Sequence, residues 1–198
     1  MIKVYGMSLS GNCYKLKLLL ELLAQPYQWV EVDILSGAAK SKEFLTLNPN
    51  GKVPLLSIDE RHLPESNAGL FYLAQNTSWF PTDHWQQAQV MQWLFFEQYS
   101  HEPAIAVARF IKTFLPADNP RQNELPELIT KGNKALQVME QHLQTRKWFV
   151  AESPSIADIA LFAYTHVASD GGFDLNPFPA IKRWLSQVKQ LPHFVPMV

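Results

Sequence analysis

The sequence contains little of what several classes of protein require. Its single cysteine, Cys13, excludes an intramolecular disulfide and a metal site built from several cysteines. Lys and Arg number 17 against 18 Asp and Glu, so the chain lacks the basic excess that is typical of nucleic-acid binding. The histidines show no metal-ligand spacing, because Ile105 stands where a His-Glu-x-x-His motif starting at His101 needs its second histidine.

Long apolar runs are absent as well. The leucine-rich segment near the N-terminus is interrupted by Lys15, Lys17 and Glu21, so it falls short of the roughly 18 apolar residues of a membrane span. The first residues also lack the basic region and apolar stretch of a signal peptide. We therefore expect a cytoplasmic protein that contacts neither membrane nor nucleic acid, and whose ligand is a small molecule.

The first 76 residues do contain alternating strand and helix patterns. Leu16, Leu19, Leu20 and Leu23 form the apolar stripe of a helix, and β-prone runs precede and follow it. The predicted order is βαβαββα: strand 2–5, a helix through 16–23, strand 27–32, helix 41–47, strand 53–58, strand 62–63 and a helix opening at 65–66.

The remainder of the chain predicts helices only. A polar stretch rich in Thr, Ser, Pro and Asp at 76–83 separates the halves, so we expect one domain at 1–76 and another at 84–198. The predicted helices are 86–114, 128–143, 156–167 and 181–191. The expected fold class is an α/β domain followed by an all-α domain.

Four short motifs lie at the ends of these predicted elements. Each has an ordinary structural interpretation, as a helix cap, an edge-strand proline or a helix start. They are Ser10-Gly11-Asn12-Cys13-Tyr14-Lys15, Asn48-Pro49-Asn50-Gly51-Lys52-Val53-Pro54, Glu65-Ser66 and Ser155-Ile156-Ala157-Asp158. The last is a Ser-x-x-Asp capping box, and we assign it to structure.

In their order and spacing, these motifs resemble those of the cytosolic glutathione transferases over essentially the whole chain. The first motif is similar to that of the serine-type (theta, delta) and bacterial Nu-type classes. The resemblance implies a thioredoxin-like N-terminal domain and a homodimer. It also implies glutathione as the co-substrate, with its thiol activated to attack a small hydrophobic electrophile in detoxification. The aromatic run 93–96, on the first predicted helix of the second domain, agrees with contact to a partner subunit.

The resemblance assigns the carboxylates and peptide of glutathione to three places. Ser66, at a helix N-terminus, would hold the γ-glutamyl carboxylate, and Glu65 its ammonium. Val53 would pair through its backbone with the cysteinyl peptide, beside a cis peptide bond to Pro54. Lys52 would meet the glycyl carboxylate, although a solvated surface lysine is an equal alternative.

Thiol activation is assigned to Ser10 and Asn12, with Ser8 in reserve. Lowering a thiol pKa from about 8.5 to roughly 6.5 requires about 2.7 kcal/mol of preferential stabilisation. A hydroxyl that donates to an anion contributes roughly 1.5–3 kcal/mol and a helix N-terminus roughly 0.3–1, so one serine at a helix end is sufficient. Capping of the helix is the alternative role of Ser10 and of Asn12.

Several alternatives stay open at this level. Cys13 is interpreted as a buried spectator in preference to a redox group. Tyr99, Arg109 and Phe110 are the candidates for a second-substrate pocket, although such residues are more often core. The alternative functions are glutathione-dependent reduction of disulfides or peroxides, and a non-catalytic interaction module of the same fold.

Overall fold

The computed structural model describes residues 1–197, which divide into two compact units. The first comprises residues 1–77 and the segment from Leu191 onward, and the second comprises residues 78–190. The C-terminal segment therefore belongs with the first unit, whereas the sequence places it in the helical domain. Tyr14 explains the difference, because its hydroxyl donates to the Val195 carbonyl at 2.7 Å.

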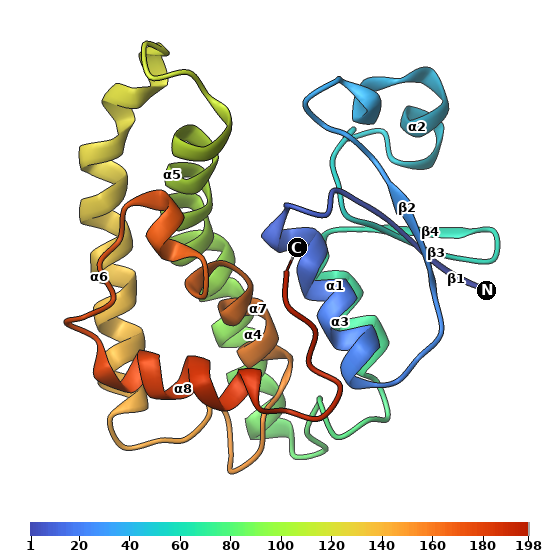
Figure 1. Cartoon of the computed structure of the whole chain (residues 1–198). Coiled ribbons are helices and arrows are strands. Elements are labelled where there is room, and N and C mark those ends of the chain that lie inside the picture. Colours follow the sequence, from blue (N-terminus) through green and yellow to red (C-terminus); the bar gives the residue numbers. More distant parts are fainter. Residues whose placement is uncertain (198) are drawn as a thin grey trace. The chain divides into compact units, whose positions relative to one another are not determined.

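The first unit has the expected βαβαββα order around a four-stranded sheet (Figure 1). The strand order is β2-β1-β3-β4; β1 and β2 are parallel, and the other neighbours are antiparallel. The elements are β1 Ile2–Gly6, α1 Gly11–Leu22, β2 Gln28–Glu31, a 3₁₀ turn Ala38–Lys40, α2 Lys42–Leu47, β3 Leu55–Ile58, β4 Arg61–Pro64 and α3 Ser66–Ala74.

Helices α1 and α3 lie side by side (Figure 1). A Cβ on Gly69 of α3 would stand 2.7 Å from Leu16 Cδ2, so a larger residue at this position would require the Leu16 side chain to shift. Leu16 and Leu70 are buried between the two helices and the sheet. This close packing brings the N-terminal turns of α1 and α3 together, where two of the sequence motifs lie.

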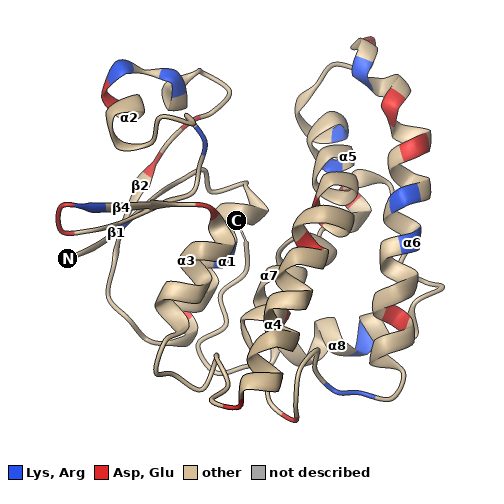
Figure 2. Ribbon diagram, turned by 180° about the vertical axis from the view of Figure 1, so that it is seen from behind, with Lys and Arg blue, Asp and Glu red and all other residues tan. Residues whose placement is uncertain are grey.

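The second unit is entirely helical over its described residues. The long helix expected at 86–114 is one helical run divided by a π-helical turn at Glu97–His101, where the hydrogen bonds lengthen to i→i+5. The elements are α4 His84–Phe96, η2 Glu97–His101, α5 Glu102–Phe114, η3 Pro120–Glu124, α6 Leu125–Leu143, α7 Ile156–Thr165, η4 Ala168–Gly171 and α8 Pro179–Lys189. Acidic and basic residues are both present along α6, with no continuous basic stripe (Figure 2).

The predicted capping box is confirmed at the start of the buried helix α7. Asp158 Oδ2 accepts the Ser155 backbone N–H at 2.9 Å, and Asp158 Oδ1 accepts Phe149 N–H and Trp184 Nε1–H. Asp158 therefore fixes the start of α7, the preceding loop and α8 at once.

Among the helices of residues 1–197, none combines the length and apolar character of a membrane span.

Candidate active site

Ser10 stands between β1 and α1 and is the N-cap of α1. Its backbone is extended, and its hydroxyl oxygen accepts the Cys13 N–H at 3.4 Å. Accepting that bond occupies a lone pair, and the hydroxyl proton has a different acceptor, which is the Cys13 thiol in this structure and would be the glutathione sulfur in the thiol-activating role. The capping role and the thiol-activating role of Ser10 are therefore compatible in this geometry.

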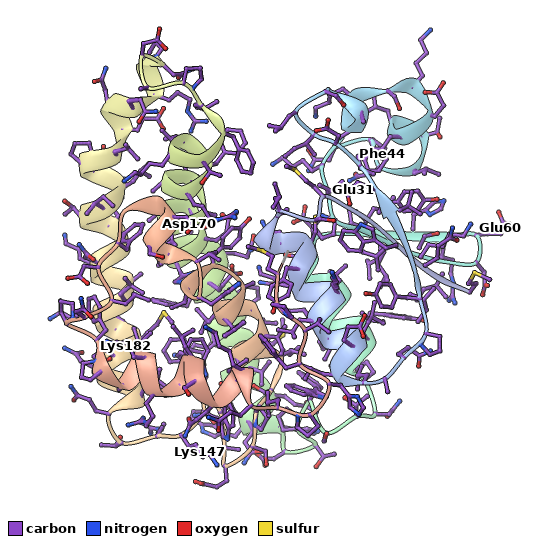
Figure 3. The ribbon with its side chains drawn as sticks, viewed as in Figure 1. Glu31, Phe44, Glu60, Lys147, Asp170 and Lys182 are labelled. Carbon is purple, nitrogen blue, oxygen red and sulfur yellow. The ribbon has the colours of Figure 1, made fainter. Side chains whose placement is uncertain are left out.

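Ser8, the reserve candidate, is already engaged by a carboxylate. Its hydroxyl donates to Glu31 Oε2 at 2.7 Å and its backbone N–H to Glu31 Oε1 at 2.9 Å. Glu31 lies at the end of β2 (Figure 3) and also accepts Trp29 Nε1–H. Partial burial opposes ionisation of Glu31, but these donors outweigh it and hold its pKa below the usual range. Since Glu31 is ionised at neutral pH, its carboxylate keeps accepting the hydrogen bond from the Ser8 hydroxyl.

Cys13 lies in the first turn of α1 with its side chain 0% exposed. Burial raises the pKa of its thiol to about 11, although hydrogen bonds from the Ser10 hydroxyl and the Met7 N–H act in the opposite direction. The thiol is therefore protonated at neutral pH and closed to solvent, and such cysteines are chemically inert.

Helix α3 begins at Ser66, which is buried, and Glu65 is its N-cap. Glu65 has a φ of 72°, an unfavourable backbone angle for a residue with a side chain. Its side chain is exposed and makes no capping hydrogen bond to the helix. The first N–H groups of α3 therefore depend on acceptors other than the Glu65 side chain.

The α1 and α3 motifs meet through a buried network that the sequence analysis missed. Ser66 Oγ–H donates to Asn12 Oδ1 at 3.2 Å, and Lys15 Nζ donates to Ser66 Oγ at 3.2 Å and to Asn67 Oδ1 at 3.2 Å. Lys15 is 0% exposed, whereas the sequence indicated only a charge interrupting an apolar helix. The available signal was its spacing, because residues three apart share a helix face and Asn12 is three residues earlier.

The segment before β3 is organised by the buried side chain of Asn48. Its amide donates to the Lys52 carbonyl at 2.8 Å, and its oxygen accepts the Asn50 N–H at 3.1 Å. The Val53–Pro54 peptide bond is cis, as the resemblance implies. Val53 lies just outside the sheet ladder, which begins at Leu55, and the Lys52 side chain is exposed.

The three candidates for a second-substrate pocket lie in different environments of the helical unit. Tyr99 is 89% exposed and lines a cavity of about 310 Å³ between η2 and α6. Arg109 is 6% exposed, and its Nε pairs at 3.1 Å with Asp170, which lies beside α5 (Figure 3). Phe110 is partly exposed and packs against Phe114 with ring centroids 5.5 Å apart.

Comparisons with known proteins agree with this arrangement. Residues 1–75 match the family model of the glutathione S-transferase N-terminal domain, and residues 100–192 match that of the C-terminal domain. A crystal structure of glutathione S-transferase from Pseudomonas fluorescens is 51% identical with a TM-score of 0.96, over 100% of this chain and 98% of that chain. This chain belongs to the glutathione S-transferase family.

Two further members of the glutathione S-transferase fold bear on its chemistry. The disulfide-bond oxidoreductase YfcG of Escherichia coli K12 is 29% identical over 192 residues, 91% of this chain and 87% of YfcG. A glutathione transferase family member from Pseudomonas fluorescens, solved with two glutathione bound, is 25% identical with a TM-score of 0.86, over 97% of this chain and 89% of that one. Within residues 1–197, no cluster of His, Cys, Asp and Glu is suited to hold a metal ion.

Proposed function

We propose that the chain conjugates glutathione to electrophilic small molecules, with Ser10 and Asn12 stabilising the glutathione thiolate. The single observation that carries this assignment is the N-cap geometry of Ser10, whose hydroxyl oxygen accepts from α1, so that its proton can be donated to a sulfur acceptor. Asn12 stands two residues along the same helix terminus and contributes its amide.

The thioether forms in one nucleophilic step. The glutathione thiol gives its proton to solvent, and the thiolate sulfur attacks the electrophilic carbon. A carbon–sulfur bond forms, and either a leaving group departs with its electron pair or a π-bond shifts its electrons away from that carbon. The Ser10 hydroxyl and the positive end of α1 supply the roughly 2.7 kcal/mol needed to lower the thiol pKa by about two units.

The anchoring groups fit the remaining chemistry of glutathione. The γ-glutamyl carboxylate binds at the N-terminus of α3, where Ser66 offers its backbone N–H, and the Glu65 carboxylate receives the ammonium. The backbone of Val53, just before the sheet ladder, pairs with the cysteinyl peptide beside Pro54. The exposed ammonium of Lys52 attracts the glycyl carboxylate.

The electrophile is an uncharged, largely apolar molecule. Phe110 is the best supported of the second-substrate candidates, because it is aromatic and partly exposed. Arg109 is engaged by Asp170, which favours a structural role, and the exposure of Tyr99 favours contact with a partner molecule.

We also propose a cytoplasmic homodimer that acts in detoxification. Phe95 is 65% exposed and Tyr99 89%, one helical turn apart, so they form an uncovered aromatic surface on α4 and η2. Trp93, from the same aromatic run, is buried and packs instead against Phe149. Light scattering tests the dimer, since a mass near 22.6 kDa at micromolar concentration would exclude it.

Glutathione-dependent disulfide reduction is the second candidate, supported by the likeness to YfcG. In that reaction the bound thiolate attacks a disulfide sulfur, a mixed disulfide forms and the other thiolate leaves. The thiolate of a second glutathione then attacks the mixed disulfide, which forms glutathione disulfide and releases the second thiolate of the substrate. Cys13 takes no part in this scheme, because it is buried and protonated.

Retention on immobilised glutathione, with elution by free glutathione, tests the binding proposal. Ser66→Ala should weaken retention, and the exposed-lysine variant Lys42→Ala should behave as the parent. Assays with a chloronitrobenzene electrophile and with a glutathione mixed disulfide then separate transferase from reductase activity. Retention without either activity would support the non-catalytic alternative.

A further inference from the structure

Lys15 is a buried cation to which the proposed reaction gives no role. Its side chain is 0% exposed, although lysine is almost never fully buried unless its charge is compensated. Its ammonium reaches the first two residues of α3, where it donates to Ser66 Oγ and Asn67 Oδ1, each at 3.2 Å. A cation from α1 therefore lies directly at the N-terminus of α3.

The hydrogen-bond directions in this network follow from the donors available. An ammonium can only donate, so Ser66 Oγ accepts from Lys15 and directs its own proton to Asn12 Oδ1 at 3.2 Å. The oxygen and nitrogen of an amide point away from each other. With its oxygen directed at Ser66, Asn12 therefore presents its two N–H donors on the opposite side.

Two positive contributions meet at the first residues of α3. The N-terminus of a helix carries a partial positive charge, and Lys15 adds a full one beside Ser66 and Asn67. Such an arrangement favours an anion at the same place. The α-carboxylate of the γ-glutamyl group is the anion that the proposed function brings there.

We propose that Lys15 is a positioning residue for glutathione. It holds Ser66 in place for the γ-glutamyl carboxylate, adds attraction for that carboxylate, and through Ser66 orients the amide of Asn12. The inference rests on the proposed function, because it requires glutathione at the N-terminus of α3. It also predicts that binding of the γ-glutamyl carboxylate and activation of the cysteinyl thiol are coupled, since one network contacts both subsites.

A charge-removing variant with a matched ligand pair tests the proposal. Lys15→Met keeps the length of the side chain, and Lys17→Met, two residues along α1 and partly exposed, is the control. The ligands are glutathione and glutathione amidated at its γ-glutamyl α-carboxylate, measured by calorimetry. Lys15→Met should weaken glutathione binding about tenfold or more and binding of the amidated analogue much less. Equal losses for both ligands, or no loss, would overturn the proposal.

A second measurement on the parent protein removes any dependence on the folding of Lys15→Met. Nitrogen-15 spectra of lysine-labelled protein report the Lys15 ammonium, which should shift on adding glutathione and barely respond to the amidated analogue. An identical response to both ligands would contradict the proposal. The two levels are distinguishable: failure of the parent to bind glutathione sinks the proposed function, whereas a parent that binds glutathione, with a Lys15→Met variant that binds it equally well, sinks only the role of Lys15.

Discussion

The Ser8 hydroxyl donates to Glu31 Oε2 at 2.7 Å, and this bond distinguishes it from the hydroxyl two residues later. Ser10 is tied to α1 through its oxygen, with the Cys13 N–H as donor. The same residue type at the same strand–helix junction therefore has two different roles. Ser8 fixes the loop to β2, and Ser10 is left as the thiol-activating candidate.

Cys13→Ala should leave glutathione binding and turnover within about twofold of the parent. The thiol is buried and its pKa of about 11 keeps it protonated, so it supplies no nucleophile. The variant still loses packing, and removal of a buried sulfur from a core typically costs on the order of 1 kcal/mol. Turnover of the folded variant checks this expectation, and its abolition would favour a cysteine-based redox reaction.

Asp158→Ala should destabilise the fold by about 3–5 kcal/mol, because it strands several buried donors at once. The carboxylate accepts from the backbone of Ser155 and Phe149 and from the Trp184 indole, and it is 0% exposed. Urea unfolding of Asp158→Ala and of the exposed-loop control Glu152→Ala measures the difference. A midpoint equal to that of the control would show that α7 does not depend on this carboxylate.

The contribution of His166 to the free energy of unfolding should fall as the pH drops from about 7 to 5, whereas Asp158, whose pKa burial raises to about 6, contributes in the opposite direction. Burial, the largest cause, lowers the pKa of His166 to about 4, and its ring donates Nδ1–H to the Phe162 carbonyl at 2.8 Å. The unfolded chain, with an ordinary pKa of about 6.5, then binds more protons than the native state in this window, so acid favours unfolding. The linkage amounts to roughly 2 kcal/mol at pH 5.

The variant His166→Gln should flatten this part of the pH dependence, while the exposed-site variant His84→Gln should retain it. Urea unfolding at pH 7 and pH 5 gives the difference for each protein. An unchanged slope in His166→Gln would assign the acid sensitivity to other groups.

Local patterns predicted most of the fold because each element carries its own signal. Leu16 and its neighbours mark α1 by helical spacing, and Ser155 with Asp158 marks the start of α7. The π-helical turn at Glu97–His101 was not predicted, because residues 86–114 were interpreted as one regular helix and the hydrogen-bond pattern within a helix is not visible in the sequence. The docking of the C-terminal segment was also missed, since it involves a contact between Tyr14 and Val195, which lie 181 positions apart in the sequence.

The site was predicted less completely than the fold, for a physical reason. Motif positions located Ser10, Asn12 and Ser66, but the bond between the last two joins residues 54 positions apart and depends on how α1 packs on α3. The burial of Lys15 follows from the same packing. Tyr99 and Arg109 differ in exposure for a related reason. A helix directs some side chains outward and others inward, and sequence spacing alone did not show which side of this helical run faces solvent.

The central claim is that Ser10 stabilises the glutathione thiolate, and one titration tests it most directly. The ultraviolet absorbance of bound thiolate is followed against pH for the parent, Ser10→Ala and the control Ser8→Ala. If Ser10 donates its proton to the sulfur, Ser10→Ala should raise the pKa of bound glutathione by about one to two units, following the roughly 1.5–3 kcal/mol of a charge-assisted bond. Ser8→Ala should leave that pKa nearly unchanged. A midpoint that stays in place in Ser10→Ala, while glutathione still binds, would contradict the account and transfer the role to Asn12.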